Sequence, residues 1–93
     1  MKINDADIFY HSKGLRIRNE EFNEITIYDR NTDQIYELNS TAAYIFRIIA
    51  EVGEISKIIE TYKNEYNISF EKSKTDVISV VQKLVKLHII KKG

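Results

Sequence analysis

The chain has 93 residues, 43% of them hydrophobic, which is enough for one small core and too little for two. Without cysteine it has no disulfide, thiolate nucleophile or cysteine-ligated metal site, as expected in a reducing cytoplasm. Its 14 basic and 14 acidic residues cancel, and it contains neither a signal-like apolar segment nor the roughly 20-residue apolar run of a membrane helix.

The first half of the chain predicts an arm followed by three strands. Residues 1–13 show no regular period, so we expect an amino-terminal arm that packs loosely or stays mobile, before a domain over residues 14–93. Apolar and polar residues then alternate over residues 15–18 and 25–28, which indicates two strands. The polar cluster at 29–33 predicts a turn that joins the second strand to a third, over residues 34–38.

The second half predicts three helices. Asn39 or Ser40 can cap a first helix that Gly53 ends, and an apolar stripe indicates a second helix over residues 54–66. Ser69 can cap a third helix that begins at Phe70 and extends to about residue 87. The fold class is therefore α+β: a winged helix-turn-helix-like domain in which a three-stranded antiparallel sheet precedes three helices.

The residue types needed for catalysis or metal binding are scattered. His11 is interpreted as a surface residue and His88 as a partly buried residue on the apolar side of the last helix, and neither has a ligand at metal-binding spacing. Glu20, Glu21 and Glu24 surround a turn and lack a nucleophilic partner. We expect no enzyme activity, no cofactor and no metal.

Two binding functions remain open. A winged helix can bind DNA, and residues 72–93 hold six lysines against one acid, but the whole chain is neutral and no arginine follows Arg47. The alternative is capture of an extended peptide by strand addition to the open edge of the sheet. The apolar arc of the last helix is wide, since Ile78 and Val85 flank its centre; these two residues either line a groove beside the third strand or pack against the sheet or the arm.

Residues 25–90 resemble the PqqD family of peptide chaperones, also called RiPP recognition elements. The resemblance is carried by Leu38-Asn39-Ser40-Thr41-Ala42 at the junction of strand and helix, by Gly53, and by Asp76-Val77 with Val80-Val81 in the last helix. Val52 stands where the family usually has an acidic residue, and Lys86-Leu87-His88 replaces a common glycine.

The resemblance implies a noncatalytic module that binds the leader segment of a ribosomally made precursor peptide and presents it to a modifying enzyme. The leader would pair with the third strand and lie against the last helix, with Asn39 and Asp76 in structural roles. The leader-binding residues that the resemblance implies are Gln34, Ile35, Tyr36, Glu37, Leu38, Lys74, Ile78, Val81, Gln82 and Val85.

The resemblance implies as partner either a radical SAM enzyme or a leader peptidase of lasso peptide assembly. The open third strand could also pair with its own copy and form a homodimer. We expect no membrane partner, and DNA binding by a winged-helix regulator is the alternative function.

Overall fold

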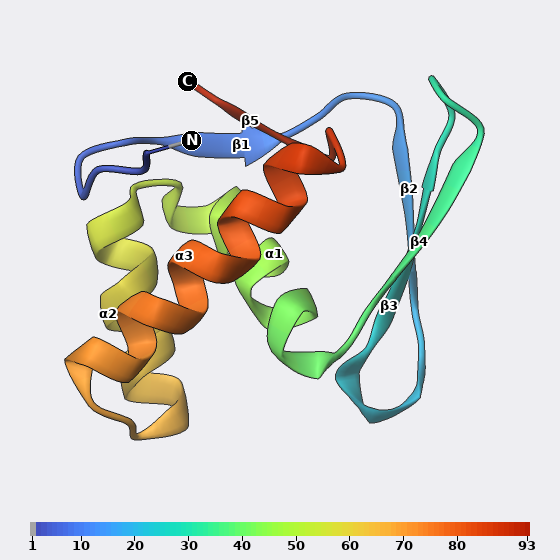
Figure 1. Cartoon of the computed structure of the whole chain (residues 1–93). Coiled ribbons are helices and arrows are strands. Elements are labelled where there is room, and N and C mark those ends of the chain that lie inside the picture. Colours follow the sequence, from blue (N-terminus) through green and yellow to red (C-terminus); the bar gives the residue numbers. More distant parts are fainter. Residues whose placement is uncertain (1) are drawn as a thin grey trace.

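Three helices and two small sheets make up residues 2–93, the part of the chain that the computed structural model describes (Figure 1). The elements in chain order are β1 (Phe9–His11), β2 (Leu15–Asn19), the 3₁₀ turn η1 (Glu21–Asn23), β3 (Ile25–Asp29), β4 (Gln34–Leu38), α1 (Ser40–Val52), α2 (Ile55–Tyr66), α3 (Phe70–Lys86) and β5 (Ile90–Lys92). The predicted α+β class, with its three-stranded antiparallel sheet and three helices, is confirmed. β1 and β5 form a second sheet that was not predicted.

The predicted capping residues begin and end the helices. The Asn39 side chain accepts a hydrogen bond from the backbone of Ala42 at 2.9 Å, and Ser69 caps α3 in the same way. Gly53 ends α1 with φ of 65°, and a Cβ there would lie 3.1 Å from the carbonyl oxygen of Phe9. These local signals explain why the predicted helix positions agree with the structure.

The three-stranded sheet has the order β2-β3-β4, with both pairs antiparallel. The turn between β3 and β4 is held by buried Asp29, whose carboxylate accepts a hydrogen bond from the backbone of Asn31 at 2.9 Å. Ile25 and Ile27 place their side chains in the core on the face that meets the helices. The predicted hairpin is therefore confirmed, and β4 is an edge strand.

Residues 8–11 do not form the loosely packed arm that the sequence suggests. Phe9 is 1% exposed and belongs to the core, and β1 pairs with β5 near the other end of the chain. The backbone of Phe9 donates to Gly53 at 2.9 Å, and that of Gly93 donates to Ile8 at 2.7 Å. The prediction of an arm is wrong for these residues because the pairing joins segments about 80 positions apart. Residue 1 of the predicted arm lies outside the described residues.

Both histidines also differ from the prediction. The ring of His11 is half-buried and stacks on Phe46 with centroids 3.8 Å apart, and its Nε2 donates to the Phe46 carbonyl oxygen at 2.6 Å. His88 is exposed and adopts a left-handed backbone with φ of 63°, because it lies in the turn after α3. His11 is thus a structural residue, and His88 is a turn residue.

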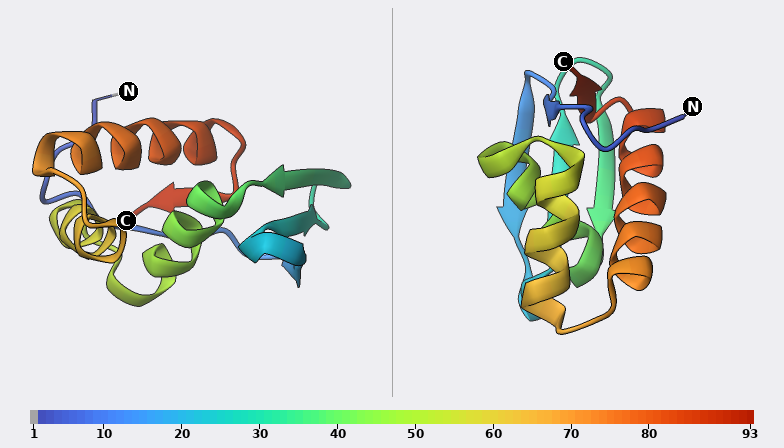
Figure 2. Two further views of the ribbon diagram at one scale, coloured as in Figure 1. Left: turned by 90° about the horizontal axis from the view of Figure 1, so that it is seen from below. Right: turned by 90° about the vertical axis from the view of Figure 1, so that its left-hand side faces the viewer.

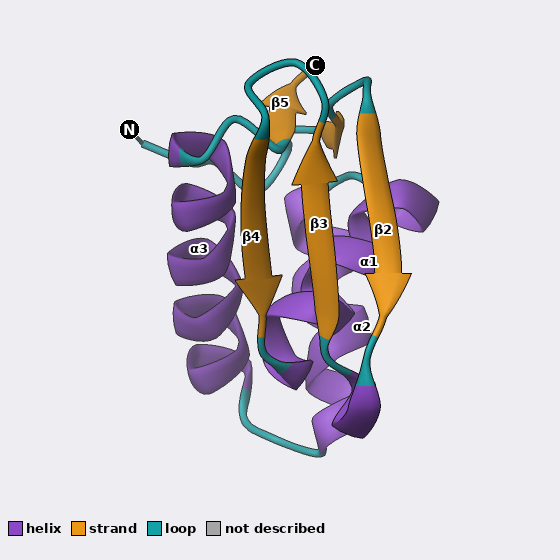
Figure 3. Cartoon of the chain, turned by 90° about the vertical axis from the view of Figure 1, so that its right-hand side faces the viewer, coloured by secondary structure: helices purple, strands orange, loops and turns teal. Residues whose placement is uncertain are grey.

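The helices lie on one side of the three-stranded sheet, and α3 runs alongside β4 (Figures 2 and 3). The core consists of apolar side chains from the helices, from β1 and β5, and from the inner face of the sheet. Within residues 2–93 no helix is long and apolar enough to cross a membrane.

Candidate functional site

The hydrogen bonds at the two ends of the β2-β3 ladder determine which way the backbone N–H and C=O groups of each residue in β4 point. The backbone of Glu20 donates to Glu24 at 2.9 Å, and that of Arg30 donates to Gly14 at 3.0 Å. In an antiparallel ladder, hydrogen-bonded residue pairs alternate with pairs that are not bonded. The register therefore makes residues 26 and 28 bond to β2, and residues 25, 27 and 29 of β3 point their backbone groups toward β4.

The same alternation leaves two residues of β4 with outward backbone groups. The β3 residues that point toward β4 have as register partners Gln34, Tyr36 and Leu38. The N–H and C=O groups of these three residues therefore bond to β3. Ile35 and Glu37 point theirs toward the free edge, the side of β4 that no strand within residues 2–93 covers. Strand addition can use Ile35 and Glu37, whereas the resemblance implied pairing along the whole third strand, residues 34–38.

The side chains of Ile35 and Glu37 lie on the sheet face that points away from the core. They share this outer face with Arg16, Arg18, Thr26 and Tyr28, and together the six line a shallow hollow of about 390 Å³. Leu38 is buried on the opposite face, and Tyr36 is half-buried there against the core. A strand added to β4 would therefore place alternate side chains on the outer face and toward the helices.

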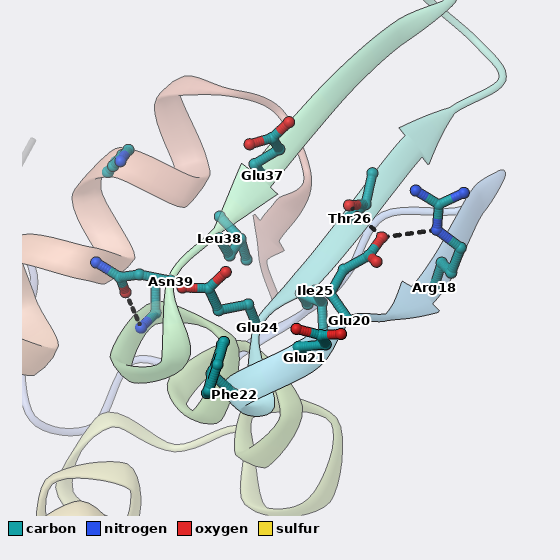
Figure 4. Close-up of a pocket in the computed structure, with 12 residues that line it drawn as sticks. Arg18, Glu20, Glu21, Phe22, Glu24, Ile25, Thr26, Glu37, Leu38 and Asn39 are labelled. Atoms are coloured by element: carbon teal, nitrogen blue, oxygen red, sulfur yellow. Dashed lines mark hydrogen bonds and ion pairs between the residues drawn. The ribbon is translucent and has the colours of Figure 1, made fainter.

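A second hollow, of about 730 Å³, lies where β4 leads into α1 (Figure 4). Its wall includes Glu37 and Leu38 at the end of β4 and Phe22 on η1. From α3 it includes Lys83, which the sequence analysis did not select. This hollow places one flank of α3 across from β4.

The other flank of α3 faces the amino-terminal segment, residues 2–7. The Lys74 ammonium lies 4.0 Å from the carboxylate of Asp5, and Lys74 does not line the hollow at β4. Figure 1 shows this segment and the three-stranded sheet on opposite sides of α3. Ile78 and Val85 share the stripe of Lys74 through helical spacing and are half-buried.

The structure therefore does not bring all predicted residues of α3 to the edge of β4. Val81 is 0% exposed and lies in the core, so it is corrected from a wall residue to a core residue. Gln82 is exposed. The stripe that includes Lys83 also contains Val80 and Leu87, at helical spacings of three and four. We call Val80, Lys83 and Leu87 the β4-facing flank, and Lys74, Ile78 and Val85 the terminal flank.

The carboxylates of Glu20, Glu21 and Glu24 line the hollow, and that of Glu20 is held in surface interactions. Glu20 accepts a hydrogen bond from Thr26 at 2.7 Å and forms an ion pair with Arg18 at 2.6 Å. The Thr26 bond, followed by the Arg18 bond, lowers the pKa of Glu20. A general acid at neutral pH needs the opposite shift. Among residues 2–93, no three potential metal ligands of the His, Asp or Glu type converge.

Asp76 has the structural role that the sequence analysis gave it. Its carboxylate accepts a hydrogen bond from the Tyr62 hydroxyl at 3.0 Å and pairs with Lys72 at 3.1 Å. Burial, and then the Asp76 hydrogen bond, raises the pKa of Tyr62 to about 12. This bond joins α2 to α3.

Phe22 is the other residue that the sequence analysis missed. Its side chain is 82% exposed, and its backbone is left-handed with φ of 58°. The available signal was a large aromatic residue inside a polar turn, between Glu21 and Asn23. An exposed apolar side chain at the rim of a hollow is suited to contact with a partner.

A family model described as coenzyme PQQ synthesis protein D (PqqD) matches residues 24–90. This match covers most of the chain and confirms the resemblance found in the sequence. No curated protein matches the chain significantly.

Three solved structures share the fold at low sequence identity. TbiB1 in complex with the TbiA(beta) leader peptide has a TM-score of 0.79 at 13% identity, covering 88% of this chain and 94% of that one. Lasso peptide synthetase B1 complexed with the leader peptide has a TM-score of 0.76 at 16% identity, with coverages of 89% and 96%. The PqqD truncation of Methylobacterium extorquens PqqCD, described as a stand-alone RiPP recognition element, has a TM-score of 0.75 at 15% identity, with coverages of 97% and 95%.

Proposed function

The chain belongs to the PqqD family, and we propose that it is a noncatalytic module that binds the leader segment of a ribosomally made precursor peptide. The observation that carries this proposal is the free edge of β4, where Ile35 and Glu37 turn unshared backbone groups outward beside α3. An extended peptide can add to such an edge through main-chain hydrogen bonds. Two of the similar structures are of complexes with a leader peptide.

In this proposal the peptide lies between β4 and α3. Its backbone pairs with Ile35 and Glu37, and its inward side chains meet Tyr36 and the β4-facing flank. Val80 and Leu87 offer apolar contact, and Lys83 offers a cation at the hollow. The terminal flank, which the sequence analysis placed in the site, takes no part.

Binding would hold the leader while the rest of the precursor reaches a modifying enzyme. A radical SAM enzyme and a leader peptidase both stay predictions, as do the cytoplasmic location and a homodimer through β4. A homodimer would use the same backbone groups as the leader, so the two would compete.

A peptide selected from a random 15-residue display library tests the proposal and does not require the leader sequence. The amide shifts of the ¹⁵N-labelled protein would be followed as this peptide is added. We expect the shifts to concentrate in residues 34–38 and around Val80 to Leu87, with residues 55–66 of α2 as an internal control. Shifts confined to α2, or failure of the library to yield any binder, would contradict the proposal. A parallel titration with random duplex DNA at low salt tests the alternative, and salt-sensitive binding would support it.

A further inference from the structure

Two rows of side chains cross the outer face and end at the free edge of β4. The rows are Arg16, Tyr28 and Ile35, and Arg18, Thr26 and Glu37. The first row ends in Ile35, which is 65% exposed, and the second ends in the exposed carboxylate of Glu37. An apolar and an acidic side chain therefore stand two positions apart on the strand that a peptide would join.

Glu37 has no bonded partner among the described residues, although cations lie near it. Arg18, in the same row, is bound to Glu20 at 2.6 Å, and Thr26 also donates to Glu20. Lys83 lines the same hollow as Glu37, but none of the ion pairs within 4.0 Å in residues 2–93 joins them. The carboxylate of Glu37 is thus available to pair with a positive charge on a strand that adds to β4.

We infer that the peptide bound along β4 carries a lysine or arginine beside Glu37 and an apolar residue beside Ile35, two positions apart. This inference rests on the proposed function and specifies which peptides the site selects. Neighbouring side chains on one sheet face lie close enough for a charge pair or an apolar pair to form. If the peptide runs antiparallel to β4, its sequence from the amino to the carboxyl end is cation-x-apolar. If it runs parallel to β4, the sequence is apolar-x-cation. The residue between them points toward α3.

Library selection against wild-type protein and against Glu37→Lys tests the inference. We expect wild-type selections to be enriched in Lys or Arg two positions from an apolar residue, and Glu37→Lys selections to carry Asp or Glu at that position. For one selected peptide, Glu37→Lys in the protein or Glu in place of the cation in the peptide should each weaken binding about threefold to tenfold. The double exchange should restore most of the affinity, and added salt should reduce the effect.

Glu60→Lys is the matched control, because Glu60 is an exposed glutamate on α2, away from the sheet. It should leave the selected sequences unchanged. Each peptide is first tested against Ile35→Pro, which removes an outward N–H group from the edge. Peptides that bind Ile35→Pro as tightly as the wild-type protein would contradict the proposed function itself. Peptides that need the edge but show the same charge preference with Glu37→Lys would overturn only this inference.

Discussion

A proline scan of β4 separates the backbone groups that hold the fold from those that bind the peptide. Proline has no N–H, so its effect depends on the direction in which that N–H points. At Ile35 the lost N–H points to the free edge, whereas at Tyr36 it points to Ile27 in the ladder. Adjacent residues should therefore respond in opposite ways.

Ile35→Pro removes one hydrogen bond to the peptide and leaves a peptide carbonyl without its donor. Together these cost about 2 kcal/mol, or about 30-fold in Kd. The fold loses no hydrogen bond, so the free energy of unfolding should change by about 1 kcal/mol or less. Tyr36→Pro breaks a ladder bond inside the sheet and should cost about 3 kcal/mol, a large part of the stability of a small domain.

Urea unfolding followed by circular dichroism gives the stability, and fluorescence anisotropy of a labelled selected peptide gives the Kd. Ile35→Ala, which keeps the N–H, controls for the loss of the side chain. These directions of the N–H groups of β4 would be refuted if Ile35→Pro unfolded the protein while Tyr36→Pro did not. Unchanged peptide affinity in a folded Ile35→Pro variant would show that the peptide does not add to β4.

Two further predictions concern the fold. Phe9→Ala should lower the free energy of unfolding by about 3–5 kcal/mol, because Phe9 is 1% exposed in the core; a change below 1 kcal/mol in urea unfolding would instead support a loose arm. The Tyr62 pKa of about 12 is above its ordinary value of 10, so the folded state favours the protonated phenol. The contribution of this pKa difference to the free energy of unfolding is fully present below pH 10 and declines as the pH rises toward 12. Tyr62→Phe should make stability fall less steeply in that range, and an equal slope in both proteins would exclude this role.

The elements that depend on neighbouring residues could be predicted from the sequence. Asn39 and Ser69 cap helices through bonds to residues three positions away, and Gly53 supplies a left-handed turn. The hairpin turn is closed by Asp29 and residues just after it. In each case the interaction spans a few residues, so the local pattern contains the information.

Pairing between the two ends of the chain could not be predicted in this way. β1 and β5 have three residues each, too few for a visible alternation, and their register joins Phe9 to Lys92. The burial of Phe9 depends on this pairing and on its contact with Gly53. The stacking of His11 on Phe46 follows from the same placement and could not be predicted either.

The position of the candidate site depends on which of the two flanks of α3 faces β4. A helical wheel shows an apolar centre with a flank on each side, but it does not say which flank a distant strand will approach. The resemblance to the PqqD family implied the flank of Ile78 and Val85. The Lys74–Asp5 pair places that flank beside the amino-terminal segment, and Lys83 places the other flank at the end of β4.

Val80→Glu and Val85→Glu test this assignment as a matched pair. Both valines are half-buried on α3 and pack against the core, and glutamate is compatible with a helix. Val80→Glu should weaken binding of the selected peptide about tenfold, since it replaces an apolar contact of the β4-facing flank with a charge. Val85→Glu should change the Kd by less than about twofold, well under 1 kcal/mol. Urea unfolding of both variants controls for loss of structure. If Val85→Glu weakens binding while Val80→Glu does not, the peptide lies on the terminal flank, as the resemblance to the PqqD family implied.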